Sequence, residues 1–166
     1  MLDLGEWNAC VCPRMGRGPR PCQNQYMVQE QGKAVKLEPK SSETVLAIVL
    51  DACVMQDNTT KCDALFVYRR PNGKWAFLVE LKGAGEMEKA FDQLSQTRRR
   101  SEYNWIVQQF ANLDPRRVKE QFVVVSNGIM GKAERERLEE KYGLRVHMIL
   151  HREPTRPVPD LRSECL

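Results

Sequence analysis

Two carboxylates and a lysine stand around one predicted β-hairpin, in the segment KCDALFVYRRPNGKWAFLVELKG (residues 61–83). Asp63 lies at the outer end of the first strand, and Glu80 and Lys82 close the second. Because side chains alternate between the two faces of a strand, Glu80 and Lys82 share one face and Leu81 lies on the other. Two carboxylates and a lysine on one sheet face are groups suited to divalent-metal phosphodiester chemistry.

The turn of this hairpin decides whether the three side chains meet. Asn72-Gly73 is a strong signal for a two-residue loop, and that loop would place Asp63 opposite Lys82. If residues 71 and 72 form the loop instead, Asp63 lies opposite Glu80. The two registers differ by two residues, so both leave Asp63 on the face of Glu80 and Lys82. Only a three-residue bulged loop would move Asp63 to the other face.

Apolar periodicity predicts the elements that must position these residues. Residues 45–55, 62–68 and 75–81 indicate three strands, although a helix capped by Ser42 competes for the first. A helix opens at Glu86, and its apolar stripe comprises Met87, Ala90, Phe91 and Leu94. A strand at 121–126, a charged helix at 132–142 and a strand at 144–150 follow. The order β-β-β-α-β-α-β predicts an α/β fold, in which an antiparallel meander leads into strands joined by helical crossovers.

Length and composition predict one domain with an irregular N-terminal arm and an extended C-terminal tail. The chain has 166 residues and a net charge of +4, which permits a polyanionic partner without requiring one. We expect an irregular basic arm over residues 1–24, one α/β domain over 25–150 and a proline-rich, extended tail over 151–166. No apolar run has the length of a membrane span, and the N-terminus lacks the order of a secretory signal. A cytoplasmic protein is therefore expected.

The six cysteines are expected to be free thiols or metal ligands, because disulfides are rare in the cytosol. Cys10, Cys12 and Cys22 lie in the N-terminal arm, where a metal site would need a fourth ligand such as Cys165. A redox or metal sensor built on these cysteines is one alternative function. Two further cysteines, Cys53 and Cys62, fall on predicted strands and are expected to be small buried residues, with a cross-strand redox pair as the alternative.

Basic residues occur in three short clusters that could contact phosphates. They are Arg14, Arg17 and Arg20 in the arm, Arg69 and Arg70 beside the hairpin turn, and Arg98 to Arg100 after the predicted helix. Contacts of this kind would bind the nucleic-acid backbone without reading its sequence.

The pattern of residues 45–126 resembles the PD-(D/E)xK nuclease superfamily, which has the restriction-endonuclease-like fold. The resemblance rests on Asp63 early in one strand, on Glu80-Leu81-Lys82 ending the adjacent strand, and on a following helix that carries Gln93 and Thr97. The stretch KCDALFV…FLVELKG is similar to small bacterial proteins of this fold. The resemblance implies a central mixed sheet flanked by helices.

The resemblance also implies an activity, which is metal-dependent hydrolysis of DNA. Asp63 and Glu80 would bind Mg²⁺ or Mn²⁺ together with the carbonyl of Leu81. Lys82 would orient the attacking water or stabilise the developing charge, and Gln93 would hydrogen-bond the water or a phosphate oxygen. Many nucleases of this fold are dimers, so a homodimer is also expected.

One feature of many members of the superfamily has no clear counterpart in this sequence. It is an acidic residue on a helix before the first strand, which assists metal binding. Glu43 is the nearest candidate, with Glu30 and Glu38 behind it, but none lies on a convincing helix. The alternative function is therefore a catalytically inactive nuclease-fold module for nucleic-acid binding or assembly.

Overall fold

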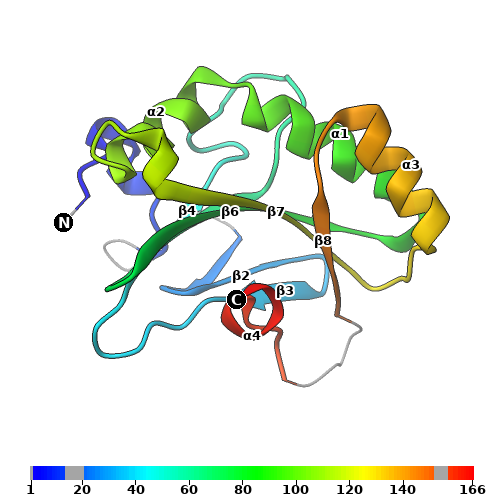
Figure 1. Cartoon of the computed structure of the whole chain (residues 1–166), viewed down its shortest axis with the longest axis horizontal. Coiled ribbons are helices and arrows are strands. Elements are labelled where there is room, and N and C mark those ends of the chain that lie inside the picture. The colour runs from blue at the N-terminus through cyan, green and yellow to red at the C-terminus, as the bar shows by residue number, and fades with distance from the viewer. Residues whose placement is uncertain (1, 14–20, 152–156) are drawn as a thin grey trace.

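The computed structural model describes residues 2–13, 21–151 and 157–166, and it contains a five-stranded mixed sheet (Figure 1). The strand order is β4-β5-β6-β7-β8, where the strands span Thr44–Val49, Ala64–Arg70, Gly73–Lys82, Val118–Ser126 and Val146–Leu150. Strands β4, β5 and β6 are antiparallel neighbours, whereas β6, β7 and β8 run parallel. The predicted α/β class, with an antiparallel meander followed by two helical crossovers, is confirmed.

Strand β4 is shorter than the predicted strand over residues 45–55. It ends at Val49, and main-chain bonds from the N–H groups of Cys53 and Met55 to the Leu50 carbonyl fold the next residues into a tight turn. The competing helix does not form, because residues 45–49 pair with β5 throughout, and all of them except Leu46 are buried.

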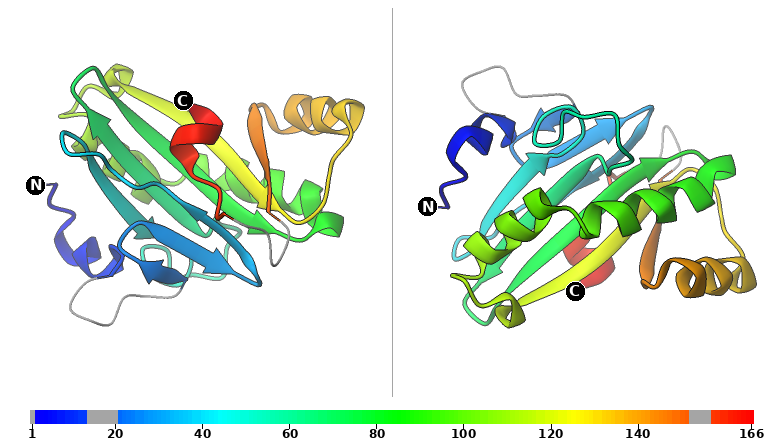
Figure 2. Two further views of the ribbon diagram at one scale, coloured as in Figure 1. Left: turned by 90° about the horizontal axis from the view of Figure 1, so that it is seen from below. Right: turned by 90° about the horizontal axis from the view of Figure 1, so that it is seen from above.

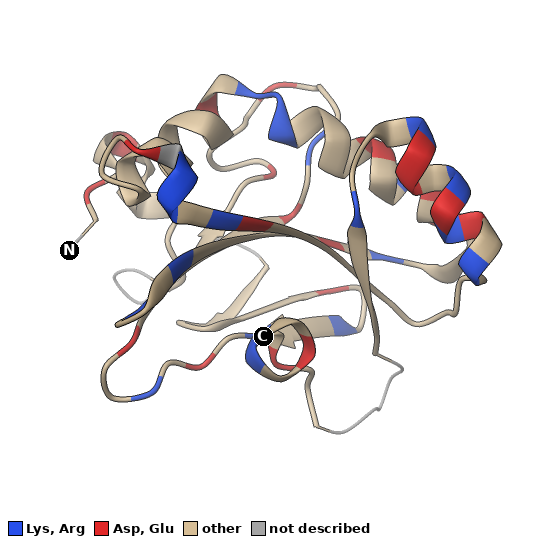
Figure 3. Cartoon of the chain, viewed as in Figure 1, with Lys and Arg blue, Asp and Glu red and all other residues tan. Residues whose placement is uncertain are grey.

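Three helices cover one face of this sheet, as Figures 1 and 2 show. They are α1 (Met87–Arg98), α2 (Ser101–Phe110) and α3 (Lys132–Tyr142). The predicted stripe of α1 is confirmed, since Ala90, Phe91 and Leu94 are fully buried and Met87 nearly so. Helix α3 buries only Leu138 and carries charges of both signs along its length (Figure 3). Two 3-10 turns, η2 (Ala84–Glu86) and η3 (Pro115–Arg117), lead into α1 and β7.

A small antiparallel sheet covers the opposite face (Figure 2). Its strands β1 (Cys22–Asn24), β2 (Met27–Glu30) and β3 (Lys33–Lys36) come from a region without a clear apolar period. The β2–β3 turn has positive φ at Gln31 (48°) and Gly32 (77°), as in the primed turns that suit hairpins. Val28 and Val35 are fully buried against the central sheet, so this hairpin forms the third layer of the molecule.

The N-terminal segment is more ordered than the irregular arm that was predicted. It forms the 3-10 helix η1 (Gly5–Cys10), and the Cys12 N–H then donates to the Ala47 carbonyl at 2.8 Å. The segment therefore extends the central sheet beyond β4, since Val11 also bridges Ile48. The predicted arginine cluster at residues 14, 17 and 20 lies outside the described residues.

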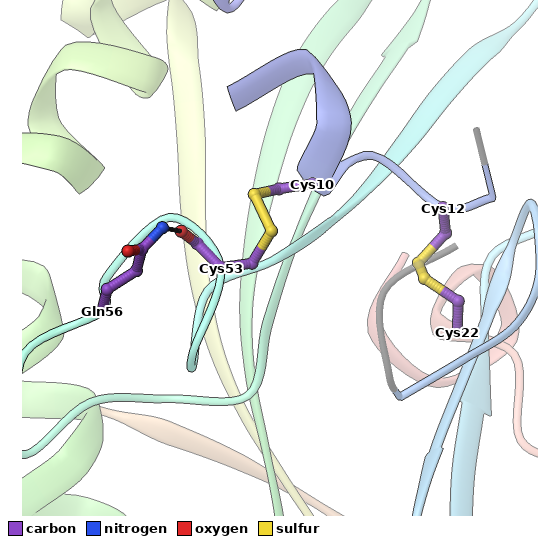
Figure 4. The surroundings of a disulfide bond; sticks show 5 residues. All are labelled: Cys10, Cys12, Cys22, Cys53 and Gln56. Carbon is purple, nitrogen blue, oxygen red and sulfur yellow. Dashed lines mark hydrogen bonds between the residues drawn. A yellow bond between two sulfur atoms is a disulfide. The ribbon is translucent and has the colours of Figure 1, made fainter. Parts of the chain in front are cut away.

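Four cysteines form two disulfides, Cys10–Cys53 and Cys12–Cys22 (Figure 4). The prediction of thiols or metal ligands is therefore wrong for these four, and so is the prediction that Cys53 lies on a strand. Cys62 and Cys165 are free thiols, so Cys165 does not join the N-terminal cysteines. The spacing gave no clue to the first bond, because its two cysteines are 43 residues apart and meet only through the fold.

The end of the tail forms a short helix rather than an extended segment. Helix α4 (Leu161–Cys165) begins at Asp160, whose side chain accepts the Arg162 N–H at 2.9 Å. Leu161 is fully buried beside the small sheet. In the part of the chain that the structure describes, no helix is long and apolar enough to cross a membrane.

Candidate functional site

The observed register of the β5–β6 hairpin brings the predicted carboxylates together. Arg70 pairs with Gly73 and Ala64 pairs with Val79, so the two-residue loop is residues 71 and 72. Asp63, immediately before β5, therefore lies opposite Glu80, which is the second of the two predicted registers. Glu80 and Lys82 face α1, on the same side of the sheet as the buried residue Leu78.

Each carboxylate is hydrogen-bonded to the main chain of the other strand. Asp63 Oδ2 accepts the Leu81 N–H at 2.8 Å, and Glu80 Oε2 accepts the Asp63 N–H at 3.2 Å. Lys82 Nζ lies 3.4 Å from Glu80 Oε1. The structure thus joins Asp63, Glu80 and Lys82 in one cluster at the end of the hairpin.

Burial makes the ionised form of this cluster unfavourable. Glu80 is 1% exposed, and burial, followed by the charge of Asp63, raises its pKa to about 9. Burial raises the pKa of Asp63 to about 6, against the opposing effect of the Leu81 N–H. Among the described residues, the Lys82 ammonium makes the only ion pair to either carboxylate. When both carboxylates are ionised, the cluster therefore carries one negative charge in excess.

Helix α1 fixes the chain that leads into Asp63. Gln93 Nε2 donates to the Lys61 carbonyl at 3.0 Å, and Thr97 Oγ1 accepts the Cys62 N–H at 2.8 Å. The other amide atom of Gln93, Oε1, is buried and has no hydrogen-bond partner among the described residues. The amide nitrogen of Gln93 therefore holds the chain just before β5, while its amide oxygen remains a buried acceptor without a donor among the described residues.

The three upstream acids considered as assisting residues lie in different places. Glu43 is at the far end of the sheet and is bound by Arg162, so it does not assist Asp63. Glu38 pairs with Lys36 at 3.2 Å on the small sheet. Glu30, at the tip of the β2–β3 hairpin, is near enough to add to the raised pKa of Asp63 after burial.

Asp51 is a further acid on this side of the molecule, and the sequence reasoning missed it. Its charge also adds to the raised pKa of Asp63, and it lies 3.8 Å from Lys61 Nζ. The sequence placed Asp51 inside a strand, whereas it lies in the turn after β4. No pattern in the sequence marked the end of β4, because apolar residues continue as far as Met55.

The loops after β6 and β7 pack closely beside the cluster. A Cβ atom on Gly128 would lie 2.2 Å from the Cβ of Ala84, so only glycine allows this contact. Ser126 Oγ accepts the Gly128 N–H at 3.1 Å and fixes the second loop. Both loops follow the carboxyl ends of parallel strands, which is the edge where open α/β sheets commonly bind ligands.

Among the described basic residues, Arg69, Arg70 and Arg100 make no ion pair with the carboxylates. Arg69 and Arg70 lie at the opposite, turn end of the hairpin. Arg100 forms ion pairs with two other carboxylates, and its Nη2 lies 2.6 Å from Asp57 Oδ2 and 2.5 Å from Glu102 Oε2. Two surface cavities, of about 1030 and 680 Å³, are lined by residues around α3–β8 and around the start of β4, and neither is lined by Asp63 or Glu80.

The oxygen atoms at this cluster are of the kind that can bind a divalent cation. No group of three or more His, Cys, Asp and Glu side chains that could hold a metal occurs within residues 2–13, 21–151 and 157–166. The protein would instead offer the carboxylates of Asp63 and Glu80 and the Leu81 carbonyl. That carbonyl faces the start of β5, because the N–H and C=O of one strand residue point to the same neighbour. Oxygen ligands of this kind are those that Mg²⁺ and Mn²⁺ prefer.

Comparisons with known proteins do not assign this site to a family. No family model matches the chain, and neither a curated protein nor a solved structure is significantly similar to it. The arrangement of Asp63, Glu80, Lys82 and Gln93 therefore rests on its own geometry.

Proposed function

We propose that this chain is a metal-dependent nuclease of the restriction-endonuclease-like fold, which hydrolyses phosphodiester bonds with DNA as the expected substrate. One observation carries the proposal. Glu80 is buried and Asp63 is partly buried beside it, at the carboxyl end of the central strand β6, and when both are ionised their charges exceed that of the adjacent Lys82. Ionised carboxylates in excess of their cations are unfavourable away from water, so the pair either keeps a proton or gains a further cation.

Each residue of the cluster has a role in this proposal. Asp63, Glu80 and the Leu81 carbonyl would hold one Mg²⁺ or Mn²⁺, which supplies Lewis-acid activation of the phosphate and a more acidic water. The Lys82 ammonium, released from Glu80 by the incoming ion, would donate to the attacking water or to a phosphate oxygen. The buried Gln93 Oε1 would accept a hydrogen from that water and so orient it.

A second candidate function is a catalytically inactive module that binds nucleic acid. It is favoured by the burial of Glu80 and by the position of Arg69 and Arg70 away from the carboxylates. A homodimer and a cytoplasmic location are further predictions from the sequence. The two disulfides weigh against the cytoplasm, because that compartment keeps thiols reduced.

Cleavage of plasmid and branched DNA with Mg²⁺ or Mn²⁺ tests the proposal. We expect Lys82→Ala to lower the rate at least about 100-fold, since it removes a donor to the transition state. Lys74→Ala is the matched control, because Lys74 lies on the same face of the same strand and its Nζ donates to the Phe110 carbonyl. DNA binding without cleavage by the unmodified protein would support the inactive module instead.

A further inference from the structure

We propose that the Cys10–Cys53 disulfide is a redox-sensitive brace for the carboxylate cluster, and that a dithiol reductant loosens the cluster by opening it. The disulfide joins η1 to the turn that follows β4, across 43 residues of sequence (Figure 4). The control of activity rests on the proposed function, whereas the mechanical link between the disulfide and Asp63 does not.

The turn that carries Cys53 is tightly folded and strained. The N–H groups of Cys53 and Met55 both donate to the Leu50 carbonyl, at 3.3 and 2.9 Å. Ala52 adopts a left-handed conformation, with φ of 62°, which is unfavourable for a residue with a side chain. Gln56 Nε2 adds a bond to the Cys53 carbonyl at 3.3 Å, which Figure 4 shows. A covalent link to this turn opposes the relaxation of Ala52 toward an ordinary conformation.

A short series of hydrogen bonds connects this turn to the carboxylates. The Leu50 N–H donates to the Asp63 carbonyl at 3.0 Å, so the first residue of the turn holds the main chain of a site residue. On the other side, Asp63 Oδ2 accepts the Leu81 N–H at 2.8 Å. Asp51, whose charge acts on Asp63, also belongs to the turn. Movement of residues 50–53 therefore reaches Asp63 through a single hydrogen bond.

The difference in exposure between the two cysteines favours attack by a reductant at the sulfur of Cys53. Cys53 is partly exposed, whereas Cys10 is 3% exposed. A thiolate of the reductant would attack Cys53 Sγ and expel Cys10 as a thiolate, which takes a proton from solvent. The second thiol of the reductant then attacks its own sulfur in the mixed disulfide and releases Cys53. Two electrons pass to the protein, the protein gains two thiols, and the reductant ends as a disulfide.

The second disulfide provides a matched control within the same chain. Cys12–Cys22 links residues 10 apart, and Cys12 packs on the opposite face of the central sheet from Asp63. Neither of its cysteines belongs to the turn after β4. Reduction of this bond should leave the Leu50 and Leu81 amides unchanged.

Amide hydrogen exchange, with dithiothreitol as the reductant, tests the brace in two double variants. In Cys12→Ser/Cys22→Ser, which keeps only the brace, we expect reduction to speed exchange of the Leu50 and Leu81 amides about tenfold or more. In Cys10→Ser/Cys53→Ser these amides should exchange quickly before and after reduction alike. The fully buried Phe66, in the centre of β5, should keep its protection in all cases.

Three results would overturn the inference, and one more separates it from the proposed function. Unchanged Leu50 and Leu81 exchange on reduction of the brace overturns it, and so does an equal response to reduction of either disulfide. Loss of Phe66 protection also overturns it, because the effect would then be global unfolding. Mn²⁺ affinity should fall about tenfold on reduction of the brace. If the oxidised protein binds no Mn²⁺, the proposed function fails while the exchange data still decide the brace.

Discussion

Two glutamates at opposite ends of the central sheet have largely buried side chains, and they differ in how completely their oxygens are hydrogen-bonded. The side chain of Glu43 is 8% exposed, and both its oxygens accept from the Arg162 guanidinium while the Lys40 N–H donates to Oε2. These hydrogen bonds lower its pKa to about 2. The side chain of Glu80 is 2% exposed and has one main-chain donor and one lysine, and burial raises its pKa to about 9.

The comparison shows that burial alone does not set the state of a carboxylate. A guanidinium that bonds both oxygens replaces the lost water around Glu43, so its charge is stable and serves to fix α4. Glu80 shares a single ammonium with the charge of Asp63 beside it. The first arrangement is complete without a ligand, whereas an added cation would supply the positive charge that the second lacks when both carboxylates are ionised.

The largest expected difference is in cleavage rate. Glu80→Gln should lower the rate of metal-dependent DNA cleavage about 10³-fold, because it removes a charged ligand from the reacting centre. Glu43→Gln should leave the rate within about threefold, measured where both variants remain folded. Equal loss in the two variants would show that the carboxylate cluster has no special part in the reaction.

The two variants should differ in stability in the opposite order, with Glu43→Gln the more destabilising change. Glu43→Gln leaves the partly exposed guanidinium of Arg162 without its charged partner, and we expect a loss of about 2 kcal/mol in the free energy of unfolding. Glu80→Gln removes a carboxyl that resists ionisation, so at pH 7 without divalent ions stability should rise by about 1–2 kcal/mol. Urea denaturation of both variants measures this. A larger loss of stability in Glu80→Gln than in Glu43→Gln would contradict this expectation.

The pH dependence of stability should separate the two sites. A carboxyl with a raised pKa favours the folded state at low pH, so without divalent ions the Glu80 contribution should be lost between pH 4.5 and about 9. The loss is at most about 1.4 kcal/mol per pH unit. Glu43 acts oppositely, because its contribution is lost as pH falls from 4.5 through about 2. Urea midpoints measured from about pH 2 to 9 should show that Glu80→Gln reduces the loss of stability above pH 4.5. The loss of stability below pH 4.5 should be unchanged in this variant.

The smallest expected effect concerns the anchor from α1. Thr97→Val removes the acceptor of the Cys62 N–H, and we expect it to slow cleavage about tenfold through displacement of Asp63, with substrate affinity little changed. Thr97→Ser keeps the hydroxyl and should restore the rate. A Thr97→Ser variant as slow as Thr97→Val would indicate a packing defect. The hydrogen bond from α1 would then not be what positions Asp63.

The convergence of Asp63, Glu80 and Lys82 could be predicted because it depends on local rules. Side-chain alternation and a two-residue turn are enough to place all three on one face, and the observed register is one of the two predicted. The apolar stripe of α1 could be predicted for the same reason, because helical periodicity is also a local rule. Gln93 could be associated with the cluster by resemblance, but the use of its two amide atoms could not, because it depends on how α1 packs over residue 61.

The missed features depend on residues far apart in the sequence. The bond between Cys10 and Cys53, and the pairing of Arg162 with Glu43 across 119 residues, form only when the layers assemble. The small sheet was missed because Val28 and Val35 are buried within short strands that show no regular alternation. Long-range packing overrides weak local signals in each of these cases.

Calorimetric titration with Mn²⁺ at pH 7, in buffers of different ionisation enthalpy, tests the central claim most directly. Without a cation, Glu80 is protonated at this pH and Asp63 is mostly ionised. We therefore expect one Mn²⁺ to bind per chain and to release about one proton, and we expect Glu80→Gln to abolish this release. Absence of binding, or binding that releases no proton and is unchanged in Glu80→Gln, would contradict it.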